Sequence, residues 1–495
     1  MSRPDRTTPQ PAPDSERAFR WSPADPPGTP PLDPWRERDA CGTGFVARAT
    51  GERSHEILRL ALTALARLAH RGATAADRSG DGAGVLTQIP RRFLAQAARD
   101  AGIRLDLEDP FAVGMLFLPR ERRARGQAIR LVDAGLRRAG LRPLGWRDVP
   151  VEPATLGARA RATLPAVAQV LVAPPARAFG GRRREHDAWE RRLYLARRLI
   201  ERRVAARGIA PFFVCSLSCR TIVYKALLTG TELAAFYPDL ASPLFETAIA
   251  VFHQRYSTNT LPSWPLAQPF RLLAHNGEIN TLWGNRNAMR AREAALASPV
   301  WGRRVRDLKP VIWTEGSDSA SLDNVLELLV RSGRDPVHAL MMLVPEAWED
   351  APQMDPDVRD FHRFHAALME PWDGPAAIAF SDGCLVGAAL DRSGLRPCRY
   401  KVTRDHLVIA GSEVGVADLD PATVVESGRL GPGDVLVVDT KRGVLLHSDE
   451  AKREVARRRP YGRWASRLIR DVPAVSEGAR TSMAPGTPAP AAAPA

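Results

Sequence analysis

Apolar positions along the middle of the chain recur with the two spacings that distinguish helices from strands. Apolar residues three or four positions apart predict an amphipathic helix at 56–69, and helices at 122–140, 184–206, 319–331 and 338–344. Short apolar runs bounded by glycine, proline or polar residues predict strands. These lie at 41–47, 85–89, 111–118, 167–173, 212–217, 221–224, 248–252, 376–380, 384–389, 399–402, 406–410 and 434–439, and the pair 212–217 and 221–224 predicts a hairpin.

The order of these elements predicts an α+β fold. Strands and helices follow one another without a regular strand–helix–strand alternation, which favours antiparallel sheets flanked by helices. Residues 91–210 carry long arginine-rich helices between strands, and we expect them to form an α/β insertion within a main domain at 41–470. No apolar run is long enough to cross a bilayer, so no membrane association is expected.

Both ends of the chain differ in composition from this domain. Residues 1–40 are rich in proline and charge, and residues 471–495 end in a proline–alanine tract, so both are predicted to be disordered. The N-terminus lacks the apolar segment of a secretory signal. Five scattered cysteines are too few for a disulfide framework and suit a reducing cytoplasm, where we expect the protein to reside.

The net charge of +14 comes almost entirely from arginine, because only five of the 70 basic residues are lysine. The arginines are spread along the chain rather than gathered in one stripe with aromatic residues, which indicates a compositional bias and no nucleic-acid partner. Cys215 and Cys219 are too far apart for the tight cysteine pair of a zinc site, and no histidine pair accompanies them. No metal site is predicted.

Cys41 stands where the polar leader meets the first predicted strand, and it allows two interpretations. Most isolated cysteines are small apolar residues that fill a core. If the chain were cut between Ala40 and Cys41, however, one residue would carry both a thiol and a free α-amine. An α-amine titrates near neutrality, so this residue would be a nucleophile with its own base.

Three further polar clusters have ordinary structural interpretations when taken singly. His-Arg-Gly-Ala at 70–73 would end a helix with Gly72 as a left-handed cap, and the glycines at 80–84 would form a tight turn, because a strand follows them. Asn276-Gly277 predicts a hairpin turn, although an amide beside an unhindered N–H also builds an oxyanion hole. Ser317 or Asp318 would cap a helix. Together with Cys41, these clusters supply what amide hydrolysis of a free amino acid needs.

The order of the motifs resembles the class II glutamine amidotransferases, and more narrowly the N-terminal domain of the glutamate synthase large subunit. The similarity is carried by Cys-Gly-x-Gly-Phe from residue 41, His-Arg-Gly-Ala from 70, Ser-Gly-Asp-Gly-Ala-Gly from 79, Arg-Tyr-Ser-Thr-Asn-Thr from 255, His-Asn-Gly-Glu-Ile-Asn-Thr from 275 and Gly-Ser-Asp-Ser-Ala from 316. It implies an N-terminal-nucleophile hydrolase fold, a four-layer αββα sandwich, and hydrolysis of L-glutamine to glutamate and ammonia through a cysteinyl thioester.

The resemblance also implies a role for each matching residue. Cys41 would be the nucleophile once residues 1–40 are removed as a propeptide, and Arg71 would orient it. Asn276 and Gly277 would form the oxyanion hole. Glutamine would be bound by three residues: Arg255 at its carboxylate, Asp318 at its ammonium, and Tyr256.

The resemblance covers residues 36–468, and the flavin, the iron–sulfur cluster and the 2-oxoglutarate site of glutamate synthase are not expected on this chain. A partner polypeptide would carry FMN and the cluster and would receive the ammonia. The alternative is a non-catalytic glutamine-sensing or regulatory module that kept the pocket, which failure of cleavage between Ala40 and Cys41 would favour.

Overall fold

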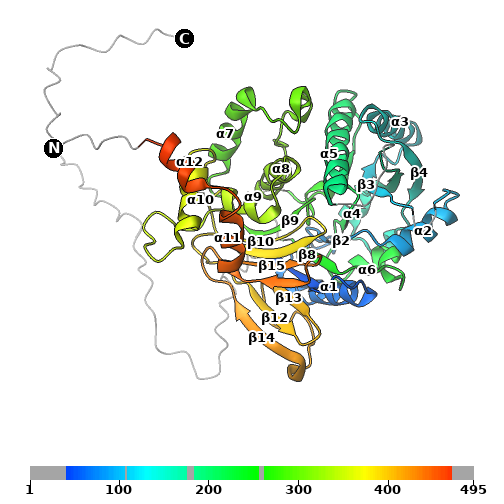
Figure 1. Ribbon diagram of the computed structural model, residues 1–495. Coiled ribbons are helices and arrows are strands. Elements are labelled where there is room, and N and C mark those ends of the chain that lie inside the picture. Colours follow the sequence, from blue (N-terminus) through cyan, green and yellow to red (C-terminus); the bar gives the residue numbers. More distant parts are fainter. Residues whose placement is uncertain (1–40, 106–108, 176–182, 256–260, 471–495) are drawn as a thin grey trace, which may run out of the picture. The chain divides into compact units, whose positions relative to one another are not determined.

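A computed structural model describes residues 41–105, 109–175, 183–255 and 261–470. It confirms a mixed α+β architecture built on three sheets (Figure 1). All pairings between the named strands are antiparallel. The predicted strands and helices are found with shifts of a few residues at their ends. None of the helices in these ranges is long and apolar enough to cross a membrane.

The largest sheet has seven strands in the order β14-β12-β13-β1-β8-β2-β7, with β1 near its middle. Gly42 at the start of β1 lies opposite Gln254 at the end of β8. This register brings the residue before Gly42 and the residue after Gln254 to the same end of the paired strands. The strands are β1 (Gly42–Arg48), β2 (Ala83–Gln88), β7 (Thr221–Ala226), β8 (Ile249–Gln254), β12 (Arg399–Thr403), β13 (Leu407–Gly411) and β14 (Val424–Arg429).

A five-stranded sheet, ordered β16-β15-β11-β10-β9, packs face to face against the first. In β10, Ala377 and Ala379 belong to the core between the two sheets, whereas Ile378 and Phe380 belong to a second core on the opposite face. Successive side chains of a strand point to opposite faces, so a strand buried on both sides is apolar throughout. The strands are β9 (Leu273–Gly277), β10 (Ala376–Ser381), β11 (Leu385–Leu390), β15 (Val435–Asp439) and β16 (Val444–Leu446).

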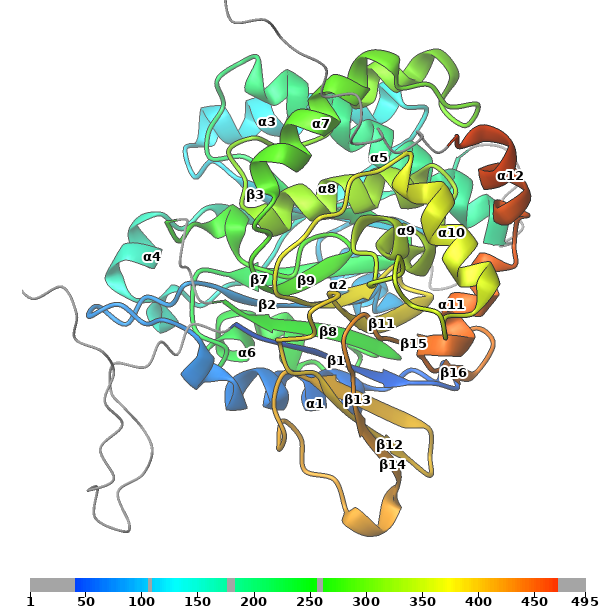
Figure 2. The ribbon, with the colours of Figure 1, turned by 90° about the vertical axis from the view of Figure 1, so that its left-hand side faces the viewer.

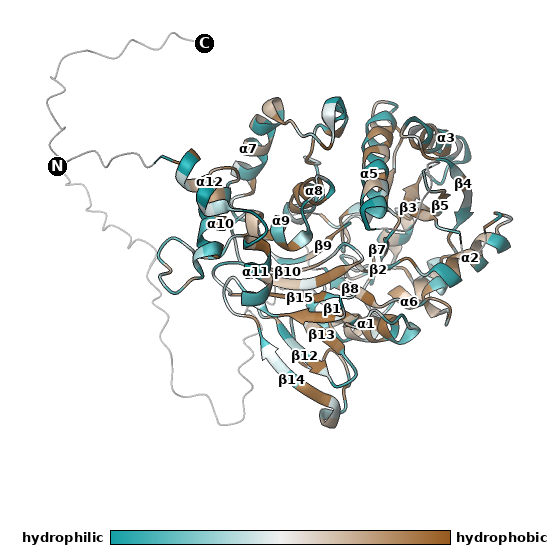
Figure 3. Cartoon of the chain, viewed as in Figure 1, coloured by the Kyte–Doolittle hydropathy of each residue, from teal (hydrophilic) through white to brown (hydrophobic). Residues whose placement is uncertain are grey.

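Helices cover the outer faces of both sheets (Figure 2). The apolar side of α1 packs on the seven-stranded sheet, and α8, α9, α10 and α11 share a core with the outer face of the five-stranded sheet. The helices are α1 (His55–Arg67), α2 (Arg91–Asp100), α3 (Arg122–Arg138), α4 (Ala158–Ala162), α5 (Arg183–Ala205), α6 (Leu233–Phe236), α7 (Leu282–Ala295), α8 (Asp318–Arg331), α9 (Pro336–Leu343), α10 (Pro356–Ala366), α11 (Ser448–Ala456) and α12 (Tyr461–Leu468). In the hydropathy colouring, much of the ribbon of α10 and α12 is teal, whereas several strands of the sheets are brown (Figure 3).

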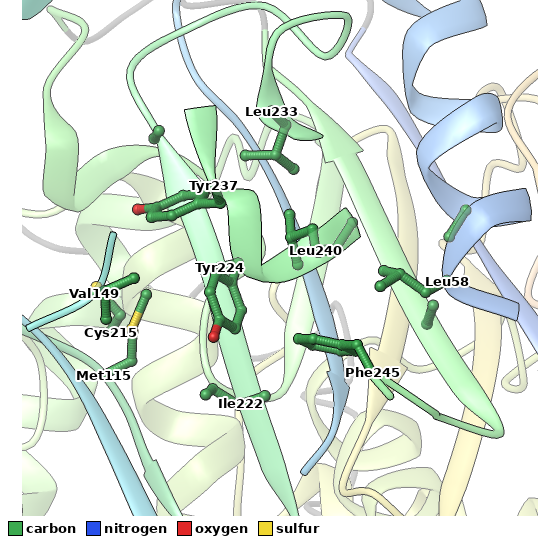
Figure 4. Close-up of a cluster of buried hydrophobic side chains, with 14 of the residues drawn as sticks. Leu58, Met115, Val149, Cys215, Ile222, Tyr224, Leu233, Tyr237, Leu240 and Phe245 are labelled. Atoms are coloured by element: carbon green, nitrogen blue, oxygen red, sulfur yellow. The ribbon is translucent and has the colours of Figure 1, made fainter. Parts of the chain in front are cut away.

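The segment predicted as an insertion contributes most of the third sheet, ordered β4-β5-β3-β6, which packs with α3 and α5. Its strands are β3 (Ala112–Leu118), β4 (Pro143–Asp148), β5 (Ala166–Val172) and β6 (Phe213–Ser218), and β6 lies just beyond residue 210. A continuous core joins this sheet to the first: Met115 of β3 and Cys215 of β6 belong to the same buried cluster as Ile222 and Tyr224 of β7 (Figure 4).

The predicted hairpin at 212–217 and 221–224 is wrong. Both strands exist, but β6 pairs with β3 and β7 pairs with β2, in different sheets. The reason lies in the link between them, where the Ser218 hydroxyl accepts hydrogen bonds from the backbone N–H groups of Arg220 (2.9 Å) and Thr221 (3.1 Å). These bonds turn the chain out of one sheet and into the next.

Candidate active site

The thiol of Cys41 lies immediately before β1, at the sheet edge where β8 ends. Cys41 is partly exposed, whereas Cys215, Cys219, Cys384 and Cys398 are buried, and all five are free thiols. Burial raises the pKa of Cys215 and of Cys398 to about 12, so these thiols stay protonated and unreactive. Exposure and position therefore single out Cys41 as the thiol that a substrate can reach.

Arg255 follows β8 directly and is 4% exposed. Its backbone N–H donates to Gly82 O (2.8 Å), and its guanidinium Nη1 lies 3.5 Å from Asp81 O. Desolvation by burial lowers the pKa of Arg255, and electrostatic interactions with Cys41, Asp81 and Asp318 act in the opposite direction. The thiol, the two carboxylates and the guanidinium thus form one electrostatic cluster, although they are far apart in the sequence.

Asp318 is the first residue of α8, and Ser317 is the N-cap. This confirms Ser317, one of the two caps predicted from the sequence. The Ser317 hydroxyl accepts from Ala320 N at 3.1 Å. The Asp318 carboxylate accepts from Ser319 N (2.6 Å) and Ile279 N (3.0 Å). A carboxylate in the first turn of a helix is also stabilised by the helix dipole. The Asp318 carboxylate is therefore held in a fixed position, where it interacts with Arg255.

Asn276 and Gly277 end strand β9 and do not form the predicted hairpin turn, because they pair with Ala377 and Ala376 of β10. The Asn276 side chain is 1% exposed, and neither its Oδ1 nor its Nδ2 has a hydrogen-bond partner among the described residues. Buried polar atoms are nearly always paired, so an amide left open points to a ligand or a water at this position.

Gly277 has a φ of +138°, and a Cβ added there would lie 1.8 Å from Pro375 O. No side chain fits at that distance from backbone, so the end of β9 requires glycine.

Substituting Gly277 by alanine is expected to lower the free energy of unfolding by on the order of 3 kcal/mol or more, because β9 and β10 would have to separate locally. Gly284→Ala is the matched control: Gly284 lies in α7, and nothing stands within 4 Å of an added Cβ. That change should stabilise α7 by up to about 1 kcal/mol. Urea denaturation measures both variants, and equal effects would contradict the packing argument.

Arg71 lies in a short 3-10 turn, Ala69–Arg71, after α1. Its Nε donates to the Glu413 carboxylate, which also contacts His70 Nε2 at 3.0 Å. Gly72 has a φ of −98°, so the predicted left-handed cap is wrong; α1 ends at Arg67, and Leu68 is its C-cap. Gly72 instead lies close to the Gln254 side chain at the end of β8, because a Cβ there would lie 2.0 Å from Gln254 Nε2. Tyr256 lies outside the described residues.

Sequence reasoning missed the buried Lys225, which holds the backbone at residues 265–267 in place. Its Nζ donates to Pro265 O (2.7 Å) and Ala267 O (2.6 Å) and lies 4.9 Å from the Phe270 ring centroid. Burial lowers the pKa of Lys225 to about 7. A single lysine after the apolar strand residues 221–224 was the signal that could have found it. Asp81, His275 and Glu413 were also missed.

The two buried histidines beside the candidate site are structural. His253 Nε2 bonds to His275 O (3.1 Å), and His275 Nδ1 bonds to Ser319 Oγ (2.8 Å). Burial lowers the pKa of His253 to about 3 and also lowers that of His275, so both rings are neutral. Within the described ranges, no group of three or more His, Cys, Asp or Glu side chains could hold a metal ion.

The family model for glutamine amidotransferases of class II matches residues 41–464, and the chain belongs to this family. Within it, the chain is related to glutamate synthases. It is 47% identical to ferredoxin-dependent glutamate synthase 2 of Synechocystis sp. over 437 residues, 87% of this chain and 27% of the relative. It is 42% identical to the glutamate synthase [NADPH] large chain of Azospirillum brasilense over 434 residues, 87% of this chain and 28% of the relative.

The chain therefore spans little more than a quarter of the length of these relatives. Among solved structures, the glutamine phosphoribosylpyrophosphate amidotransferase of B. subtilis matches 46% of this chain and 40% of its own, with 18% identity and a TM-score of 0.29. That likeness is too weak to support an argument about the site.

Proposed function

We propose that the chain hydrolyses L-glutamine to glutamate and ammonia, with Cys41 as the nucleophile. Two observations carry the proposal: Cys41 and Asp318 both interact electrostatically with the buried Arg255, and the buried Asn276 amide has no hydrogen-bond partner among the described residues. A thiol, a guanidinium and a carboxylate are complementary to the amide, α-carboxylate and α-ammonium of glutamine. The family match also begins at Cys41.

In the proposed reaction, residues 1–40 are first removed, which gives Cys41 a free α-amine. This amine takes the thiol proton as Sγ attacks the side-chain amide carbon of glutamine. The Asn276 Nδ2 and the Gly277 N–H stabilise the oxyanion of the tetrahedral intermediate. Its collapse returns the proton to the leaving nitrogen, releases ammonia and leaves a thioester. Attack by water then releases glutamate and restores the thiol.

Substrate binding follows from the charges of the same cluster. Arg255 would pair with the glutamine α-carboxylate through two parallel N–H···O bonds, a geometrically strict arrangement. Asp318 would receive the α-ammonium, and Tyr256 would contribute to the same pocket. Two charged contacts at the α-carbon hold the side-chain amide at a fixed distance, so the reacting carbon is positioned for attack.

The finer fold assignment rests on the same grounds. We infer an N-terminal-nucleophile hydrolase fold, the αββα sandwich, for the part of the chain that belongs to the family. Two sheets packed face to face, with helices on both outer faces, support it. So does the place of Cys41 directly before a central strand. A cytoplasmic location stays a prediction.

A partner for the ammonia is the second part of the proposal. Because the chain spans about a quarter of its glutamate synthase relatives, we infer a synthase-type polypeptide that carries FMN and an iron–sulfur cluster and accepts the ammonia. Co-purification of the chain with products of neighbouring genes should recover such a protein. If the isolated chain turns over glutamine rapidly and none of those products binds it, the partner inference fails.

The experiment that tests the function is a glutaminase assay on the purified chain, with and without removal of residues 1–40. Release of glutamate and ammonia from L-glutamine by the processed form alone is expected. Saturable glutamine binding without any hydrolysis by the processed form would favour the alternative, a non-catalytic glutamine-sensing module.

Glu413 is expected to be a positioning residue for this reaction, because it bridges His70 and Arg71. Glu413→Gln should lower kcat by about 10- to 100-fold, since small displacements near reacting atoms have effects of that size, while KM for glutamine changes little. Asp418→Asn is the control: Asp418 pairs with Arg67 on the surface, its side chain is 86% exposed, and such pairs contribute little. Steady-state kinetics of the two variants tests this prediction. An equal loss of kcat in both variants would contradict the positioning role of Glu413.

A further inference from the structure

A cavity of about 690 Å³ lies away from the glutamine site, between the start of α5, the end of α8, the C-terminal end of α10 and helix α12. It shares no residue with the candidate active site. Helix α8 spans the separation, with Asp318 as its first residue and Arg331, which lines the cavity, as its last. A helix of this length places its ends about 20 Å apart.

The lining of this cavity is strongly basic. It contains seven arginines and four carboxylates, a surplus of three positive charges. Three of the arginines already use all four carboxylates: Arg220 pairs with Asp187 and Asp382, Arg331 with Glu190, and Arg458 with Asp335. The other four arginines form no ion pair among the described residues, although Asp187 also lies near Arg191: they are Arg183, Arg191, Arg334 and Arg459.

Two of these cations, Arg191 and Arg334, are also partly removed from water. Burial lowers the pKa of Arg191; Asp187 acts in the opposite direction, and the neighbouring guanidinium groups of Arg220 and Arg331 lower it further. Burial likewise lowers the pKa of Arg334, whose Nε is buried and has no hydrogen-bond partner among the described residues. Crowding like charges in a partly desolvated cavity is unfavourable unless an anion occupies it.

Aromatic side chains form the remaining wall. Phe364, Tyr461 and Trp464 line the cavity and contact one another, with ring centroids 5.4 to 5.6 Å apart. Aromatic faces stack on planar rings, whereas guanidinium groups match the geometry of phosphate. A volume of this size is also typical of small-molecule sites.

We propose that this cavity binds a phosphorylated compound of nucleotide size, with the phosphates on Arg191, Arg334 and Arg459 and a planar ring against Tyr461 and Trp464. The presence of unpaired guanidinium groups and an aromatic wall in one cavity is what assigns the ligand class. The cavity would then be a regulatory or co-ligand site at the far end of the helix that carries Asp318.

Isothermal titration of the full chain with ATP, tripolyphosphate and adenosine, at one fixed low ionic strength, tests this proposal. ATP and tripolyphosphate should each saturate one site per chain, with ATP several-fold tighter, and adenosine should not saturate. The double variant Arg191→Gln/Arg334→Gln should weaken ATP binding at least 10-fold. Arg138→Gln, an exposed arginine on α3, is the matched control and should leave binding unchanged.

Folding does not confuse the result. Arg459 is exposed, so Arg459→Gln leaves the core intact. Because Arg459 contacts only the phosphates, this variant should weaken the binding of ATP and the binding of tripolyphosphate to the same extent. Absence of saturable binding of both polyphosphates would overturn the proposal, and so would binding that the double variant and Arg459→Gln leave unchanged. Tripolyphosphate binding as tightly as ATP would overturn the assignment of the aromatic wall to a planar ring.

Discussion

Replacing Cys41 by alanine is expected to lower the kcat of glutamine hydrolysis on the order of 10⁴-fold or more, the scale on which loss of a covalent nucleophile acts. The physical reason is that no other described thiol can take its place. Cys398 is buried, with its pKa raised to about 12, so Cys398→Ala should leave kcat unchanged within the assay error. The measurement is glutamate release at saturating glutamine, for both variants.

Selective alkylation provides an independent check of the same prediction. A chloroketone analogue of glutamine should add one adduct per chain, at Cys41, and glutamine should protect against it. Substantial labelling of a buried cysteine, or retention of activity by Cys41→Ala, would show that the nucleophile lies elsewhere.

Substituting Arg255 by glutamine is expected to lower kcat/KM for glutamine by about 10²- to 10³-fold, because a buried charged contact to the substrate is lost. A substrate that lacks the α-carboxylate, 4-aminobutanamide, offers a chemical control. The wild-type protein should hydrolyse it as poorly as Arg255→Gln hydrolyses glutamine. With 4-aminobutanamide, Arg255→Gln should show little further loss of kcat/KM, because this substrate already lacks the carboxylate that Arg255 would contact.

This cycle separates a substrate contact from a structural role. If Arg255 only stabilised the sheet edge, the two losses would add, and 4-aminobutanamide would be hydrolysed far more slowly by the variant than by the wild type. Additive losses would therefore contradict the assignment of Arg255 to the carboxylate.

Elements with a clear apolar period could be predicted from the sequence, whereas the secondary structure of the polar segments around the site could not. Strand β9 was missed because it carries His275 and Asn276, polar residues that are buried beside the Asp318 segment. The Asn276-Gly277 pair favours a turn in isolation, whereas pairing with β10 overrides that preference. Helix α7 was missed for a similar reason, since it begins within the same polar, glycine-containing run.

Long-range pairs mark the other limit of sequence reasoning. Arg71 and Glu413 are 342 positions apart, and nothing in the sequence around either residue indicates the other. The motifs identified Cys41, Arg255 and Asp318 as candidates. Only the folded chain shows that Cys41 and Asp318 interact with the guanidinium group of Arg255. The basic cavity was likewise hidden, because widely spread arginines gave the appearance of a uniform bias.

The central claim is that glutamine hydrolysis requires Cys41 as the first residue of the chain. The most direct test is intact-mass spectrometry with N-terminal sequencing of the fraction that hydrolyses glutamine. We expect that fraction to begin at Cys41, with residues 1–40 absent. A fraction that hydrolyses glutamine at full rate while retaining the bond between Ala40 and Cys41 would contradict the account.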